Sequence, residues 1–109
     1  MSSREERVGR NEAISREMNE AIESSQARTS PQGHLRMLCE CSNLGCEELI
    51  AISIEEYERV RQDSRTFAVW KAHVTPDVEH IVEETDRYTV VRKREGTPAA
   101  VAEETDPRT

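Results

Sequence analysis

The chain has 109 residues, of which 34% are charged and 35% hydrophobic, and its formal net charge is −7 at pH 7. So short and polar a chain predicts a single small domain with a limited core. The acidic charge disfavours an electrostatic grip on nucleic acid or anionic lipid, so we expect no direct partner of either kind. No apolar run is long enough to span a bilayer and the N-terminus is charged, so we expect a cytoplasmic protein.

Residues 1–24 are predicted to form an N-terminal helical arm. No proline interrupts the stretch from Arg4 to about Ser24, and apolar residues recur there at helical spacing, namely Ile14, Met18, Ala21 and Ile22. Opposite charges one turn apart are expected to pair on the solvated side, Glu6 with Arg10 and Glu12 with Arg16. Because the apolar stripe is thin, the helix needs a surface to dock on, either its own domain or a partner.

Two segments with little apolar content flank the predicted domain. The stretch SSQARTSPQG is rich in serine, glycine and proline, so we predict a flexible linker over residues 25–33. The C-terminal stretch EGTPAAVAEETDPRT contains two prolines and no aromatic residue. We therefore expect residues 96–109 to be a disordered tail.

Residues 34–95 are predicted to form an α+β domain with a small antiparallel sheet and one central helix. The stretches HLRMLCE and EELIAIS flank a turn that contains Asn43 and Gly45, which indicates a β-hairpin. Ser53 followed by Glu56 forms a capping box, which predicts a helix over IEEYERVRQDS.

The second half of this domain is predicted to be mostly strand. TFAVW has the composition of a short strand, and VEHIVEE and RYTVVRKR indicate two more, joined near residues 85–87. Thr75 and Pro76 are also good helix-start residues, so the segment from Pro76 to Glu84 could instead begin with a helical turn.

The three cysteines of the chain, Cys39, Cys41 and Cys46, lie within eight positions of one another. In a reducing compartment such a group indicates metal ligands before disulfides. The spacing Cys-x-Cys-x4-Cys lets the sulfurs converge once the chain turns at Gly45, and thiolates are preferred donors in structural zinc sites. Three other interpretations stay open: buried free thiols, a disulfide that leaves one thiol over, and an iron–sulfur cluster.

Tetrahedral zinc takes a fourth ligand, and the chain offers three histidines. We favour His73, because its loop follows TFAVW and ligation there would close a long chain loop and join distant parts of the domain. His34 is close to the cysteines in sequence and stays an alternative. His80 lies between apolar residues, so we expect it to pack in or against the sheet.

The run CECSNLGCEELIAISIEEYERVRQDSRTFAVWKAH resembles the core of a group of short, largely uncharacterised actinobacterial proteins. Their pattern is Cys-x-Cys, a third Cys, a Glu-Tyr helix, Val-Arg, Phe-x-Val and then His, and the resemblance extends from RNEAISREMNEAI through YTVVRK. It implies a Cys3His zinc site made of Cys39, Cys41, Cys46 and His73. It also implies framework roles for Tyr57, Arg61 and Phe67, and it brings no established activity.

We derive three functional hypotheses of different classes. The preferred one is a non-enzymatic zinc-binding interaction or regulatory module that presents residues 4–24 to a larger protein partner. The second is a thiol redox sensor, in which oxidation of Cys39 or Cys41 ejects the zinc. The third is a small metalloenzyme. The sequence supports it least, because we interpret the carboxylates beside the thiols as solvated surface; these are Glu40, Glu47 and Glu48.

Overall fold

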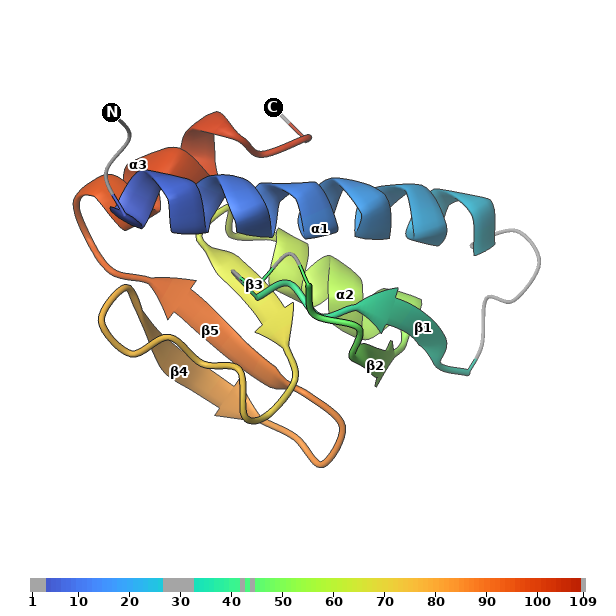
Figure 1. Cartoon of the computed structure of the whole chain (residues 1–109). Coiled ribbons are helices and arrows are strands. Elements are labelled where there is room, and N and C mark those ends of the chain that lie inside the picture. The colour runs from blue at the N-terminus through green and yellow to red at the C-terminus, as the bar shows by residue number, and fades with distance from the viewer. Residues whose placement is uncertain (1–3, 27–32, 42, 44, 109) are drawn as a thin grey trace.

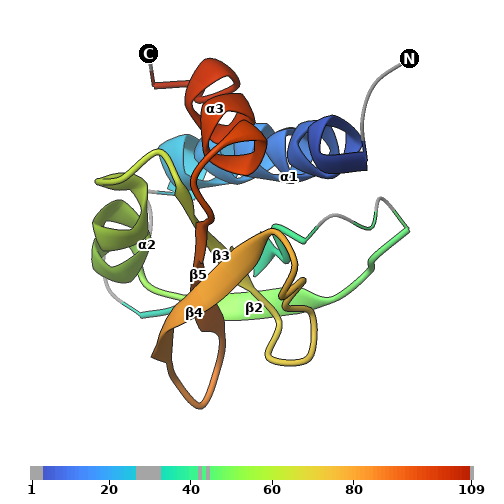
Figure 2. The ribbon, with the colours of Figure 1, turned by 90° about the vertical axis from the view of Figure 1, so that its left-hand side faces the viewer.

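The computed structural model describes residues 4–26, 33–41, 43 and 45–108. This part of the chain forms three helices and two small antiparallel sheets, which confirms the predicted α+β class (Figure 1). The elements are, in chain order, α1 (Arg4–Gln26), β1 (Leu35–Leu38), β2 (Leu49–Ile52), α2 (Ile54–Arg61), β3 (Thr66–Val69), β4 (Glu79–Glu84), β5 (Thr89–Lys93) and α3 (Thr97–Glu104). Helices α1 and α3 pack together on one side of the strands (Figure 2).

The predicted N-terminal helix is present as α1 and ends at Gln26. Most of the predicted linker, residues 27–32, lies outside the described residues. Within the described ranges, no helix combines the length and the apolar character needed to cross a membrane.

Strands β1 and β2 form the predicted hairpin around the cysteine loop, with Leu35 opposite Ile52. Helix α2 begins directly after β2 and carries the predicted capping box. The Ser53 hydroxyl accepts the backbone N–H of Glu56 at 3.0 Å, and the Glu56 carboxylate accepts the backbone N–H of Ser53 at 2.9 Å. These bonds satisfy N–H groups that the first helical turn leaves without partners, which is why four residues of sequence suffice to locate this helix.

The second sheet has the antiparallel strand order β3-β5-β4. A tight connection joins β4 to β5 as predicted, with the backbone N–H of Thr85 donating to the Tyr88 carbonyl at 2.9 Å. The alternative of a helical turn near Thr75 reduces to a single turn, in which the Val78 N–H donates to the Thr75 carbonyl at 3.1 Å. The main core lies between this sheet, the hairpin and α2, and its fully buried members include Met37, Ile50, Ile52, Tyr57, Ala68 and Tyr88.

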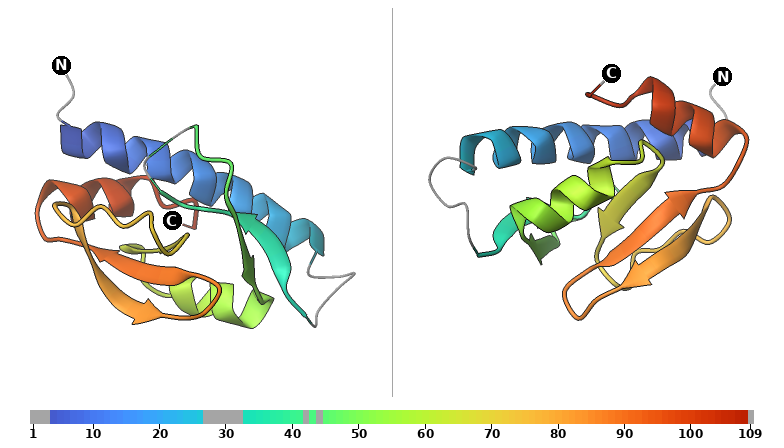
Figure 3. Two further views of the ribbon diagram at one scale, coloured as in Figure 1. Left: turned by 60° about the horizontal axis from the view of Figure 1, so that its bottom comes forward. Right: turned by 180° about the vertical axis from the view of Figure 1, so that it is seen from behind.

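Helix α1 packs on its own domain through a face that includes several polar residues. Glu12, Arg16 and Asn19 are fully buried, whereas Ile14 and Met18 on the apolar stripe are 47% and 52% exposed. The views from below and from behind show α1 lying lengthwise against the rest of the chain (Figure 3). The expectation that Glu12 and Arg16 form a solvated pair was therefore wrong, because both side chains find partners inside the domain.

The partner of Glu12 comes from the central strand β5. The Lys93 ammonium donates to Glu12 at 2.5 Å and to Glu79 on β4 at 2.6 Å. All three side chains are fully buried. A buried charge is tolerated only when it is paired and hydrogen-bonded. The contacts with Lys93 therefore allow the Glu12 side chain of α1 to face the sheet.

The buried Arg16 is held by backbone and aromatic groups. Its guanidinium donates to the carbonyls of Ser64 and Ala102 at 2.6 Å and 2.7 Å, and it lies 4.3 Å from the centre of the Phe67 ring. The long side chain thereby connects α1 with α3 and β3. Contact between a guanidinium and an aromatic face is stabilising and is stronger where water is excluded.

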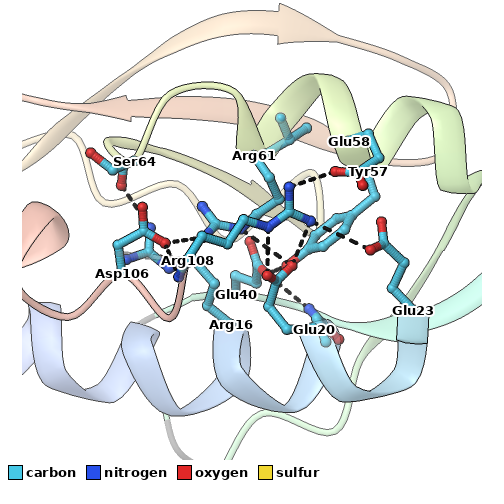
Figure 4. A network of polar contacts seen from close by, with 12 residues as sticks. Arg16, Glu20, Glu23, Glu40, Tyr57, Glu58, Arg61, Ser64, Asp106 and Arg108 are labelled. Carbon is cyan, nitrogen blue, oxygen red and sulfur yellow. Dashed lines mark hydrogen bonds and ion pairs between the residues drawn. The ribbon is translucent and has the colours of Figure 1, made fainter. Parts of the chain in front are cut away.

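A third polar network ties the C-terminal residues to α1 and α2 (Figure 4). Arg61 on α2 is buried, forms an ion pair with Asp106 and lies 3.5 Å from Glu20. Arg108 pairs with Glu20 at 2.5 Å and with Glu58 at 2.6 Å. The C-terminal residues are therefore part of the folded unit.

Residues 97–104 form helix α3, so the expectation of a disordered tail was wrong there. The helix buries four compact residues, Pro98, Ala99, Val101 and Ala102. Helix α1 approaches it closely at Gly9, where a Cβ atom would lie 2.5 Å from Cγ1 of Val101. Such small side chains bury enough apolar surface to stabilise a helix only when a second helix packs closely against them. Here the second helix is α1, from the other end of the chain.

Candidate metal centre

The cysteine loop is shaped by the strand before it and by a turn at Asn43. Cys39 and Cys41 follow β1 directly, and Cys46 lies before β2. The backbone N–H of Cys46 donates to the Asn43 carbonyl at 3.0 Å, and the N–H of Gly45 donates to the Asn43 side-chain oxygen at 2.9 Å. Asparagine favours such turns because its side chain can hydrogen-bond the backbone two residues on. The turn brings Cys46 back toward the first two thiols.

Strand β3 places His73 beside these thiols. The backbone N–H of Glu40 donates to the Ala68 carbonyl at 2.9 Å, which holds the start of the loop against β3. After β3 the chain turns, with the His73 N–H donating to the Trp70 carbonyl at 2.8 Å. The histidine therefore meets the cysteines through tertiary structure, although β2, α2 and β3 separate it from Cys46 in the sequence.

Cys39, Cys41, Cys46 and His73 lie close together, with one donor atom of each within 4.8 Å of the others. Nδ1 of His73 is 3.6 Å from the Cys39 sulfur and 3.4 Å from the Cys46 sulfur. In a tetrahedral zinc site, Zn–S bonds of about 2.3 Å and Zn–N bonds of about 2.0 Å separate sulfur from nitrogen by roughly 3.5 Å. The arrangement is thus a candidate metal site in which the two distances from His73 to the sulfurs match tetrahedral spacing.

Burial disfavours the thiolate form of two of the cysteines. Cys39 and Cys41 are buried, and burial raises the pKa of both thiols. The backbone N–H of Trp70 donates to the Cys39 sulfur at 3.0 Å, which opposes this shift because the bond favours the thiolate. Thiolates are the form that binds a metal, so binding here must release protons.

The other two histidines lie elsewhere. His34 is exposed just before β1, and His80 is exposed on β4. Neither belongs to the group of donors that could hold a metal ion among the described residues. The expectation that His80 packs in or against the sheet was wrong: β4 is an edge strand that leaves most of its side chains in solvent.

Glu40 is the residue whose role the sequence did not reveal. We interpreted it, with Glu47 and Glu48, as solvated surface; the latter two are exposed, but Glu40 is fully buried. A signal was available, because successive residues of an extended chain point to opposite sides. If Cys39 and Cys41 face the metal, Glu40 between them must face the domain interior.

All three cysteines are free thiols, so the structure contains none of the disulfides considered above. A pocket of about 160 Å³ opens beside the thiols and is lined by Cys41, Asn43, His73, Val74 and Thr75. The three expected framework residues, Tyr57, Arg61 and Phe67, are buried.

Comparisons of the chain with protein-family models, curated proteins and solved structures return no match. The resemblance to the actinobacterial group stays a prediction. Function has to be argued from the site and the surface.

Proposed function

We propose that this protein is a non-enzymatic zinc-binding interaction module that presents the outer face of α1 to a protein partner. We use "outer face of α1" for the exposed residues Ile14, Met18 and Ala21. The observation that carries the proposal is the orientation of α1: polar residues such as Glu12, Arg16 and Asn19 are buried, whereas Ile14 and Met18 are 47% and 52% exposed.

Zinc is the ion that best suits the donor set. Three sulfurs and one imidazole nitrogen are soft or borderline donors, whereas calcium and magnesium require oxygen ligands. Four protein donors also complete a tetrahedral site. Such a closed site leaves no position at which the ion could bind a substrate or activate water, which favours a structural role over catalysis.

The outer face of α1 suits one common mode of protein recognition. A helix that binds in a groove is anchored by apolar residues three or four positions apart, and Ile14, Met18 and Ala21 have this spacing. Ile22, the remaining member of the predicted stripe, packs against the core instead. The partner we propose is therefore a larger protein with an apolar groove.

Replacing Ile14 and Met18 by aspartate is expected to abolish partner capture while leaving the fold intact. Both side chains are about half exposed, so the free energy of unfolding should change by no more than about 0.5 kcal/mol for each exposed site. The measurement compares proteins captured from native cells by wild type and by the double variant, with thermal unfolding recorded on both. Glu17→Ala, an exposed change on the same helix, is the control and should capture as wild type does. A double variant that retains every specifically captured protein would exclude this face as the binding surface.

A thiol redox sensor is the second candidate, and the pocket beside the thiols favours it. Cys46 is only partly buried, and the pocket reaches Cys41 and His73. A peroxide could oxidise two zinc-bound thiolates to a disulfide. The peroxide takes up two electrons and two protons. Hydrogen peroxide becomes two molecules of water, and an alkyl peroxide becomes one alcohol and one water. The zinc ion then leaves the site.

Hydrogen peroxide is expected to release zinc from the reduced protein in proportion to disulfide formation. A zinc-sensitive dye reports the metal, and the mass of the intact chain reports the loss of two hydrogens. Cys46→Ser tests which thiol reacts first, because it removes the most accessible sulfur. Retention of zinc at a several-fold excess of peroxide would argue against the sensor.

A further inference from the structure

Asn19 on α1 binds the protein backbone on one side of Cys39 and a side chain on the other. Its side-chain oxygen accepts the backbone N–H of Leu38 at 2.7 Å, and its side-chain nitrogen donates to the Leu38 carbonyl at 2.8 Å. The same nitrogen donates to the Glu40 carboxylate at 3.0 Å. One buried side chain of α1 therefore contacts the residues on both sides of Cys39, a candidate metal ligand.

Glu40 extends this contact to the rest of the domain (Figure 4). Besides Asn19, its carboxylate accepts the Tyr57 hydroxyl of α2 at 2.7 Å and the backbone N–H of Ala68 on β3 at 3.0 Å. Glu40 is fully buried and lies between Cys39 and Cys41 in the sequence. The backbone that presents two thiols is thus fastened to three elements through one carboxylate.

We infer that helix α1 is part of the support of the metal site, so that metal binding and the docking of α1 strengthen each other through Asn19 and Glu40. The inference rests on the proposed function, since it assumes that the four clustered donors bind zinc. Coupling between two sites is reciprocal: if the metal holds the helix, the helix must raise the affinity for the metal by the same factor.

The polar character of the interface is the reason for the coupling. Hydrogen bonds depend on distance and angle, so a shift of the cysteine loop weakens them, whereas apolar packing would tolerate the same shift. When residues 39–41 lose the metal, Asn19 and Glu40 lose a fixed set of partners. A buried polar group without its partner costs free energy, which α1 can avoid by moving away from the domain. Metal occupancy would then control how the outer face of α1 is presented.

Asn19→Ala is expected to lower zinc affinity about 10–100-fold, the range typical of residues that orient metal ligands from the outer shell. Affinity is measured by competition with a chromophoric chelator. Glu17→Ala is the matched control, because it truncates an exposed residue on the same helix and should leave zinc affinity unchanged. Equal zinc affinities of Asn19→Ala and wild type would overturn the coupling.

Hydrogen exchange of the wild-type chain tests the reverse direction without any substitution. Removal of zinc is expected to accelerate amide exchange in α1 and in residues 38–46, while the β4–β5 hairpin keeps its protection. Unchanged exchange in α1, or an equal loss of protection in α1 and in β5, would show that the metal does not act on the helix specifically. A wild-type chain that binds no zinc would sink both this inference and the zinc site. Loss of partner binding in the Ile14 and Met18 variant bears only on the proposed function.

Discussion

Replacing His73 by alanine is expected to weaken zinc binding by at least about 100-fold. This is more than the effect expected for a residue that only orients a metal ligand. The substitution removes the only nitrogen donor of the group and leaves three sulfurs. Because zinc binding contributes roughly 10–16 kcal/mol in structural sites of this class, the loss should also lower the thermal stability of the zinc-loaded protein.

Cobalt substitution gives the direct readout of this change. Cobalt(II) bound tetrahedrally by three sulfurs and one nitrogen has visible absorption bands, and these should shift and weaken in His73→Ala. His34→Ala is the matched control, because His34 is exposed and lies outside the donor group, and its spectrum should be that of the wild type. A wild-type spectrum in His73→Ala together with an altered one in His34→Ala would reverse the ligand assignment. Less than a tenth of an equivalent of zinc in the reduced wild-type protein would remove the zinc site altogether.

Lys93→Met is expected to destabilise the protein by about 3–5 kcal/mol at neutral pH, the usual cost of removing one partner from a buried ion pair. The variant leaves the carboxyls of Glu12 and Glu79 buried and without the ammonium that both contact in the wild type. Chemical denaturation measures the change. Lys71→Met, which removes an exposed lysine, is the control and should stay within about 0.5 kcal/mol of wild type.

The deficit of Lys93→Met should grow as the pH rises. Burial raises the pKa of Glu12 from 4.5 to about 8 even though Lys93 lowers it, so removal of Lys93 must raise that pKa further. A carboxyl whose pKa is raised in the folded state does not lower the free energy of unfolding at pH values below its pKa in the unfolded chain, because it is protonated in both states. In the wild type this cost accumulates from about pH 4.5 to about 8, and in Lys93→Met it continues to grow above 8, so the part of the deficit that comes from Glu12 appears above pH 8.

A second substitution tests whether unpaired charge is the cause. Adding Glu12→Gln to Lys93→Met should recover part of the lost stability and flatten the pH dependence, since one of the two uncompensated carboxyls is gone. A deficit that is independent of pH, and that Glu12→Gln does not reduce, would mean that Lys93 acts through packing of its aliphatic chain.

The candidate site could be predicted from the sequence to the extent that its signals are local. Cys39, Cys41 and Cys46 lie in one loop, and the turn at Asn43 that folds them together is recognisable from composition. His73 could only be favoured among three histidines, because its approach to the thiols depends on how β3 pairs with the start of the loop. The supporting residues Asn19 and Glu40 were missed, since polar residues in an acidic chain are ordinarily exposed.

By itself, the sequence determined the elements whose stabilising contacts are near in the chain: the β1–β2 hairpin, helix α2 with its Ser53 capping box, and the strands of the second sheet. Only the tertiary structure decided which side of α1 is buried and whether residues 97–104 fold. Periodicity placed Ile14 and Met18 on a stripe that could dock on the domain or on a partner, because it ranks side chains by hydrophobicity alone. Three polar residues of α1 are buried instead, because Glu12 contacts Lys93, Arg16 contacts Phe67 and two carbonyls, and Asn19 contacts the cysteine loop. These partners are distant in sequence, and a buried charge becomes favourable only once such a partner is in place.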